Sequence, residues 1–337
     1  MRSALCLASV ALVVAVVAPK DAVAQYVVTP PTISGRTASG PDPILPADVL
    51  ARVQLAAAEV EHIRFVMGRP RAKTPRLTVV GSAPHTVWFS ALTAFHKANR
   101  LCFEHTGYRA APPPVPPPDR IGPADVWKVA NLALTRILLV KRELGIRSVA
   151  NERLAPTTAR PDQVLATLLR LNQQLNLLLE RRISASDVYM EVTRAVHICA
   201  RLLARFPGAP RMAEAPAFTP GKVPADVMRR LVATFDVVRE IATHSGLSMC
   251  KVSARIDAEV VPSEVYAAAQ LLVAELSYIA QRAGELRNVV PVHYPGRRFP
   301  AHVFQRARRL KAQLSLLRVR VDSDPGWIGR ARVGANR

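Results

Sequence analysis

The sequence predicts an all-α protein of eight long helices, arranged in a repeat of about 38 residues. The first observation behind this prediction is a start signal, usually Pro-x-Asp or Pro-x-Glu followed by valine. It recurs eight times, and each time a similar apolar pattern follows. The first-turn valines are Val49, Val87, Val126, Val164, Val188, Val227, Val265 and Val303.

The spacing of the first-turn valines is the second observation, and it divides the chain into two halves. Successive valines are 38 or 39 residues apart, except for one step of 24 residues between the fourth and the fifth. Each of the first four precedes its counterpart in the second set by 139 or 140 residues. We therefore expect a tandem duplication of a four-helix unit, with units at residues 46–183 and 185–320.

The residues that follow each valine justify the eight helices. Offsets of 4, 7, 11 and 14 residues carry apolar or small side chains and no charged residue in any segment. These offsets lie on one face of a helix and predict a core seam. Offset 1 always holds a large side chain, which we interpret as core at the helix starts; a ligand groove is the alternative.

Local signals set the expected helix ends. Seven of the eight segments begin with proline, which lacks only an N–H that the first helical turn leaves unbonded. An acidic residue follows in most first turns, where it opposes the helix dipole. Glycines such as Gly107 and Gly246 suit a left-handed cap at the helix end. We expect helices of about 20–22 residues, or about 30 Å.

The linkers between helices are rich in proline and arginine, and the run Pro112–Pro118 predicts an extended polyproline II segment. Such a linker can run back along a whole helix, so consecutive helices can be parallel or antiparallel. Only residues 182–185 separate the fourth and fifth helices. They predict a tight hairpin or one bent rod between the halves.

Residues 1–24 predict an export signal. Arg2 precedes an apolar run, and Ala22, Val23 and Ala24 form a small-x-small cleavage site before Gln25. The apolar run is shorter than the about 20 residues that a spanning helix needs, and no later stretch qualifies. We expect cleavage between Ala24 and Gln25, a periplasmic or secreted chain, and an N-terminal extended segment at 25–45.

The net charge of +21 favours contact with a polyanion or an anionic membrane, although an arginine-rich genomic composition would also produce it. Positive charge is dense in the last helix and in the basic C-terminal tail, 321–337. Offsets 3, 5 and 6 of the last helix avoid the seam, so their side chains can stay in solvent. The candidate residues for binding an anionic partner are Arg297, Arg298, Arg306, Arg308 and Arg309. A solvated outer face on a terminal helix is the alternative.

Motifs for catalysis, cofactors and metals give no candidate residue in any of these classes. Of the cysteines after the export signal, Cys199 lies on an apolar column, whereas Cys102 and Cys250 could pair in an oxidising compartment.

The expected function is therefore that of an exported, non-catalytic scaffold or interaction protein with a basic surface. Its partner would be an anionic envelope component, such as a lipid headgroup, a polysaccharide or an acidic protein; nucleic acid is less favoured. The alternative is a periplasmic enzyme or ligand carrier with a pocket between the two units. A deep cavity with convergent polar groups would favour that alternative.

Overall fold

A computed structural model describes most of the chain after the export signal. The signal, most of the segment 25–45, residues 117–118 of the proline run, Arg181 and the end of the basic tail lie outside the described residues. In the described part the chain is mostly helical, with eight α-helices and few strands, as the repeat predicted. The described residues are 43–116, 120–151, 155–180, 182–257, 259–285 and 292–329.

The helices are 18 to 23 residues long, close to the expected length. They divide into a first half, α1 to α4, and a second half, α5 to α8. Their bounds are α1 Pro46–Val66, α2 Pro84–Thr106, α3 Pro123–Glu143, α4 Pro161–Leu178, α5 Ala185–Leu203, α6 Pro224–His244, α7 Pro262–Arg282 and α8 Pro300–Asp322.

The predicted start signals act at the helix N-termini. In α1 the carboxylate of Asp48 accepts a hydrogen bond from the backbone N–H of Leu45 at 2.8 Å. The first-turn acids of α3, α5, α6 and α7 accept the equivalent bond. This bond satisfies an N–H that the helix itself leaves unpaired. At the other end, α2 stops at Gly107, whose φ of 71° is left-handed.

The predicted seam forms the core. All eight first-turn valines, and every residue at offsets 4, 7, 11 and 14, are no more than 3 % exposed. The column includes Cys199 and Leu178, both 0 % exposed. The apolar columns of the sequence are therefore confirmed as the packed interior.

Within each half, the four helices begin at one end. The first-turn prolines and valines of α1, α2, α3 and α4 together line one apolar hollow. The corresponding residues of α5 to α8 line a second hollow. Helices whose N-termini meet in this way run in the same direction, so each linker must return along the length of a helix. This decides between the parallel and antiparallel arrangements in favour of the parallel one.

The same pairs of helices pack in both halves. α1 and α2 each pack against α3 and α4, and α5 and α6 each pack against α7 and α8. The linker from α1 to α2 crosses α4, where the Gln174 side chain donates to Pro70 O at 3.1 Å. The linker from α5 to α6 crosses α8, where Gln313, at the same offset, donates to Arg211 O at 2.8 Å.

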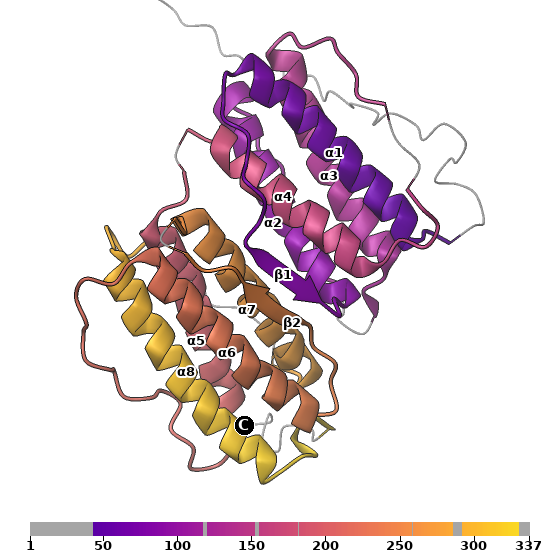
Figure 1. Ribbon diagram of the computed structural model, residues 1–337. Coiled ribbons are helices and arrows are strands. Elements are labelled where there is room, and N and C mark those ends of the chain that lie inside the picture. Colours follow the sequence, from indigo (N-terminus) through magenta and orange to yellow (C-terminus); the bar gives the residue numbers. More distant parts are fainter. Residues whose placement is uncertain are drawn as a thin grey trace, which may run out of the picture.

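The two halves pack through α2 and α7, which run in opposite directions (Figure 1). His85, in the first turn of α2, contacts Glu275 in the second half of α7 at 3.0 Å. Lys97, further along α2, lies 5.7 Å from the ring centre of Tyr266 in the first turn of α7. Because each half is parallel internally, this crossing opposes the summed helix dipoles of the two halves.

Two short strands also join the halves (Figure 1), and the all-α expectation did not include them. β1 (Leu77–Val80) and β2 (Lys251–Ala254) pair antiparallel, with Leu77 opposite Ala254 and Val80 opposite Lys251. Both strands lie in linkers that the sequence predicted to be extended. Extended segments brought side by side satisfy their backbone groups by pairing, which is the physical reason for the difference.

Two connections complete the second half. The chain passes from α4 to α5 over residues 179–184 and reverses direction, as the hairpin alternative required, because the two halves are antiparallel. After α8, the 3₁₀-helix η2 (Trp327–Gly329) folds back. The indole of Trp327 is 3 % exposed and its Nε1 donates to Ser245 Oγ at 2.9 Å. The first part of the predicted tail is therefore packed on the second half.

Candidate anion-binding surface

The five arginines that the sequence singled out lie on or just before the first half of α8. Arg297 is exposed and stacks on Phe299, with its guanidinium carbon 5.3 Å from the ring centre. Arg298 is half-buried, and so are the three arginines within the helix. The expectation that these three side chains stay in solvent is therefore wrong. The linker and α5 pack beside α8 and cover part of each side chain.

Two of these arginines hold the linker from α5 to α6. Arg309 Nε donates to Ala213 O at 3.0 Å, and Arg308 donates to Ala217 O at 3.3 Å. Each bond uses only part of a guanidinium group, which has five N–H donors. Arg308 and Arg309 therefore have a structural role, and each retains its positive charge beside the groove.

The Tyr189 cluster, formed by Tyr189, Arg298 and Arg306, lies between α5 and α8. The guanidinium carbons of Arg298 and Arg306 are 5.2 and 5.3 Å from the ring centre of Tyr189. Arg306 Nε also donates to Thr193 Oγ1 at 3.0 Å. Stacking on an aromatic ring holds arginine side chains in place and leaves their charge uncancelled.

Like charges crowd at this cluster. Burial lowers the pKa of Arg306, and the neighbouring charges of Arg309 and Arg298 lower it further. Among the described residues, no carboxylate lies within ion-pair distance of these three arginines. An anion bound here would relieve the repulsion.

A second stack lies on the other side of α8. Lys222 Nζ is 5.0 Å, and the guanidinium carbon of Arg230 is 5.4 Å, from the ring centre of Phe304. Sequence analysis missed both cations. A usable signal was present, because Arg230 has offset 3 and Phe304 has offset 1, like Arg306 and Tyr189.

The stack of an offset-3 arginine on an offset-1 aromatic is also part of the fold. In the first half, Arg52 lies over Trp127 at 5.1 Å with the same offsets. What distinguishes the second half is the additional cation at each ring. We call the resulting surface the basic face; its members are Lys222, Arg230, Arg297, Arg298, Arg306, Arg308 and Arg309.

The charges of the basic face are not compensated within the described part of the protein. None of its seven cations forms an ion pair there, whereas nearby Arg229 binds Asp226 at 2.8 Å and Arg318 binds Glu240 at 2.6 Å. Uncompensated charge of one sign makes a positive field that reaches about 8 Å at physiological salt.

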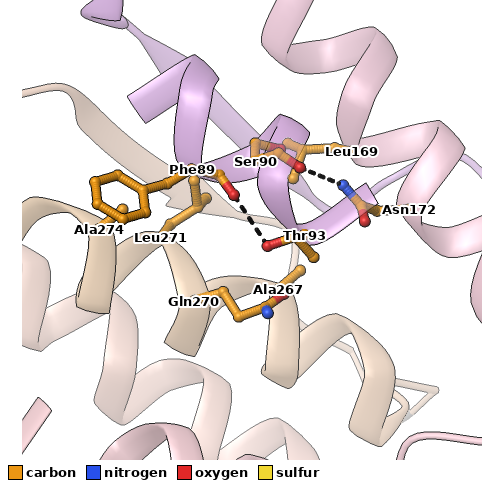
Figure 2. Close-up of a pocket in the computed structure, with 9 residues that line it drawn as sticks. All are labelled: Phe89, Ser90, Thr93, Leu169, Asn172, Ala267, Gln270, Leu271 and Ala274. Atoms are coloured by element: carbon orange, nitrogen blue, oxygen red, sulfur yellow. Dashed lines mark hydrogen bonds between the residues drawn. The ribbon is translucent and has the colours of Figure 1, made fainter. Parts of the chain in front are cut away.

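A small hollow lies between the two halves, lined by residues of α2, α4 and α7 (Figure 2). Its empty volume is about 290 Å³, much of it open to solvent, and the enclosed part has room for about one water molecule. The polar side chains serve the backbone: Asn172 donates to Ser90 O, and Thr93 donates to Phe89 O, both at 3.1 Å. A hollow of this kind does not favour the carrier or enzyme alternative.

Lys97 lies beside this hollow and was also missed by sequence analysis. It is 6 % exposed, and its Nζ donates to Asn172 O at 3.0 Å. Burial lowers the pKa of Lys97 to about 7. Enzymes use lysines with such a pKa as bases or nucleophiles, but only where a substrate can reach the amine. This amine is enclosed by protein, so we assign it to the junction of the halves.

The remaining candidate chemistry is weak. Cys102, Cys199 and Cys250 are free and buried, so Cys102 and Cys250 do not pair. Burial raises the pKa of Cys250, which leaves its thiol unreactive. No group of metal-ligating side chains and no helix suited to crossing a membrane occurs within the described ranges.

Comparison with protein-family models, with curated proteins and with solved structures finds no match for this chain.

Proposed function

We propose that the protein is an exported, non-catalytic interaction protein whose basic face binds an anionic component of the cell envelope. The observation that carries this proposal is the crowding of Arg298, Arg306 and Arg309, with no described carboxylate close enough to pair with them. Holding three like charges together costs stability unless an anion compensates them. Stability alone would favour an acidic or neutral residue there.

The partner that best fits this surface is an anionic membrane. Exposed aromatic rings accompany the cations: Tyr294 is 56 % exposed, Phe299 52 % and Phe218 48 %. Phe299 and Phe218 both contact His302 in the first turn of α8, with ring centres 5.9 and 5.1 Å away. Aromatic rings beside basic residues suit the headgroup region of a bilayer, where the rings enter the interface and the cations meet phosphates.

The test is binding of the mature chain to vesicles that contain phosphatidylglycerol, measured by co-sedimentation over a salt titration. Replacing Arg298 and Arg306 by glutamine should weaken binding about 30-fold, because each basic residue near such a surface contributes about 1 kcal/mol. The matched control is Arg229→Gln with Arg318→Gln, which removes the same charge from two paired residues. Equal loss in the two variants, or wild-type binding that salt does not weaken, would refute the assigned surface. Binding only to a polysaccharide or an acidic protein would refute the membrane as partner.

We also propose that the two halves arose by duplication of one four-helix unit. Three observations support this: the 139-residue correspondence of the first-turn valines, the same pairs of packed helices, and the shared linker bonds of Gln174 and Gln313. Producing residues 185–329 alone tests it, because a duplicated unit should fold cooperatively. A chain that remains unfolded would count against the proposal.

Export rests on residues 1–24, so it is tested on protein from the native host. The mature chain should begin at Gln25 by N-terminal sequencing. Protein that retains Met1 and stays in the cytoplasm would exclude the envelope as its location.

A further inference from the structure

Two buried polar atoms near the Tyr189 cluster have no hydrogen-bond partner in the described protein. They are Nε of Arg298 and Nδ1 of His197. Buried polar groups in native proteins are nearly always bonded to protein, water or an ion, so each exception calls for an explanation. Both atoms belong to residues on the same groove, between α5 and α8, which pack together.

The groove is built from two regular faces. On α5, Tyr189, Thr193 and His197 follow at intervals of four residues and therefore share one side of the helix. On α8, Arg306 uses only its Nε on Thr193 Oγ1. The two terminal amino groups of Arg306 have no partner among the described residues. They remain available for a bidentate acceptor.

The equivalent groove of the first half, between α1 and α4, lacks this chemistry. Leu50 and Ala58 stand at the offsets of Tyr189 and His197, and Ala159 and Thr167 stand at those of Arg298 and Arg306. The two halves nevertheless pack through the same helix pairs. The cluster is therefore not required for packing a half of this kind.

We propose that the groove at the Tyr189 cluster is a binding site for a phosphate monoester group, held by Arg298 and Arg306. This proposal deepens the proposed function and rests on it for the membrane as the source of the phosphate. A terminal phosphate carries nearly two negative charges and three acceptor oxygens, which match two arginine forks. A phosphodiester presents one charge and two free oxygens, so it fits the site less well.

The first experiment titrates the full mature chain with inorganic phosphate and follows its histidines by NMR. Burial and the charge of Arg306 lower the pKa of His197, so a bound dianion should raise that pKa. His96 is the internal control, because burial and the distant Arg194 lower its pKa instead. We expect a saturable change at His197 only. It should disappear in Arg298→Gln and persist in Arg318→Gln, with circular dichroism confirming that both variants fold.

Equal changes at both histidines, no change at either, or an unaltered response in folded Arg298→Gln would overturn the site. The second experiment identifies the source of the phosphate. Vesicles with phosphatidic acid, a monoester, are compared with vesicles of phosphatidylglycerol, a diester, at matched surface charge. We expect about tenfold preference for phosphatidic acid, the usual scale for a charged hydrogen bond, and competition by inorganic phosphate.

These arms separate the two proposals. Salt-dependent binding to both vesicles without preference, and without a response at His197, would retain the basic face and eliminate the phosphate site. A response at His197 with no vesicle binding would retain the phosphate site for a free phosphorylated ligand and refute the membrane.

Discussion

Replacing Lys97 by methionine should remove a pH dependence that burial of this amine imposes on the whole protein. The side chain is 6 % exposed at the junction of the halves, with one hydrogen bond, to Asn172 O. Burial lowers its pKa from the ordinary 10.5 to about 7. Methionine has a similar length and no charge, so it fills the same space without that cost.

The sign and size follow from proton linkage. Between pH 7 and pH 10.5 the unfolded chain binds the Lys97 proton and the folded chain largely does not, so stability rises with pH. One proton corresponds to about 1.4 kcal/mol per pH unit, less near pH 7, where the folded state is still half protonated. The wild-type protein should therefore gain a little over about 2 kcal/mol between pH 7 and pH 9 that Lys97→Met does not gain.

The assay is urea unfolding of both proteins at pH 7, 8 and 9, followed by circular dichroism. Other titrating groups are common to the two proteins and cancel in the difference. Lys128→Met is the control, because its side chain is 70 % exposed and should leave the pH dependence unchanged. Parallel stability curves for wild type and Lys97→Met would refute the burial argument.

Three further predictions concern the core, the junction and the thiols. Leu178→Ala should cost roughly 2–5 kcal/mol, because the side chain is fully buried; Leu316→Ala, at a 38 % exposed position of α8, should cost at most about 0.5 kcal/mol, and equal costs in chemical denaturation would mean that the buried face is wrong. Arg76→Ala should cost about 3–5 kcal/mol by thermal or urea unfolding, because Arg76 bonds the buried Glu264 at 3.1 Å across the junction, and a neutral result would contradict its structural role. The three buried cysteines should resist a thiol reagent until denaturant is added, whereas rapid labelling of the native chain would show that the halves open readily.

Much of the candidate surface was visible in the sequence. The arginines at Arg297, Arg298 and Arg306 stood out because no acidic residue lies close to them along the chain. Their stacking on Tyr189 could not be foreseen, because the ring lies on a helix more than 100 residues earlier. Exposure was misjudged for the same reason: an offset describes the face of one helix, not the linker that covers it.

The sequence by itself determined the helices, their ends and the residues of the core. Those properties depend on neighbours within a few turns, and a first-turn proline, an acid at the start and an apolar seam act locally. Only the tertiary structure decided the parallel direction of the helices, the pairing of β1 with β2, and the burial of Lys97. These depend on contacts between distant segments: β1 and β2 are extended pieces of different linkers, and Lys97 becomes a buried charge only where α4 and α7 close over α2. Desolvation and backbone pairing are set by whatever packs nearby in space, and a pattern read along one helix does not contain that neighbour.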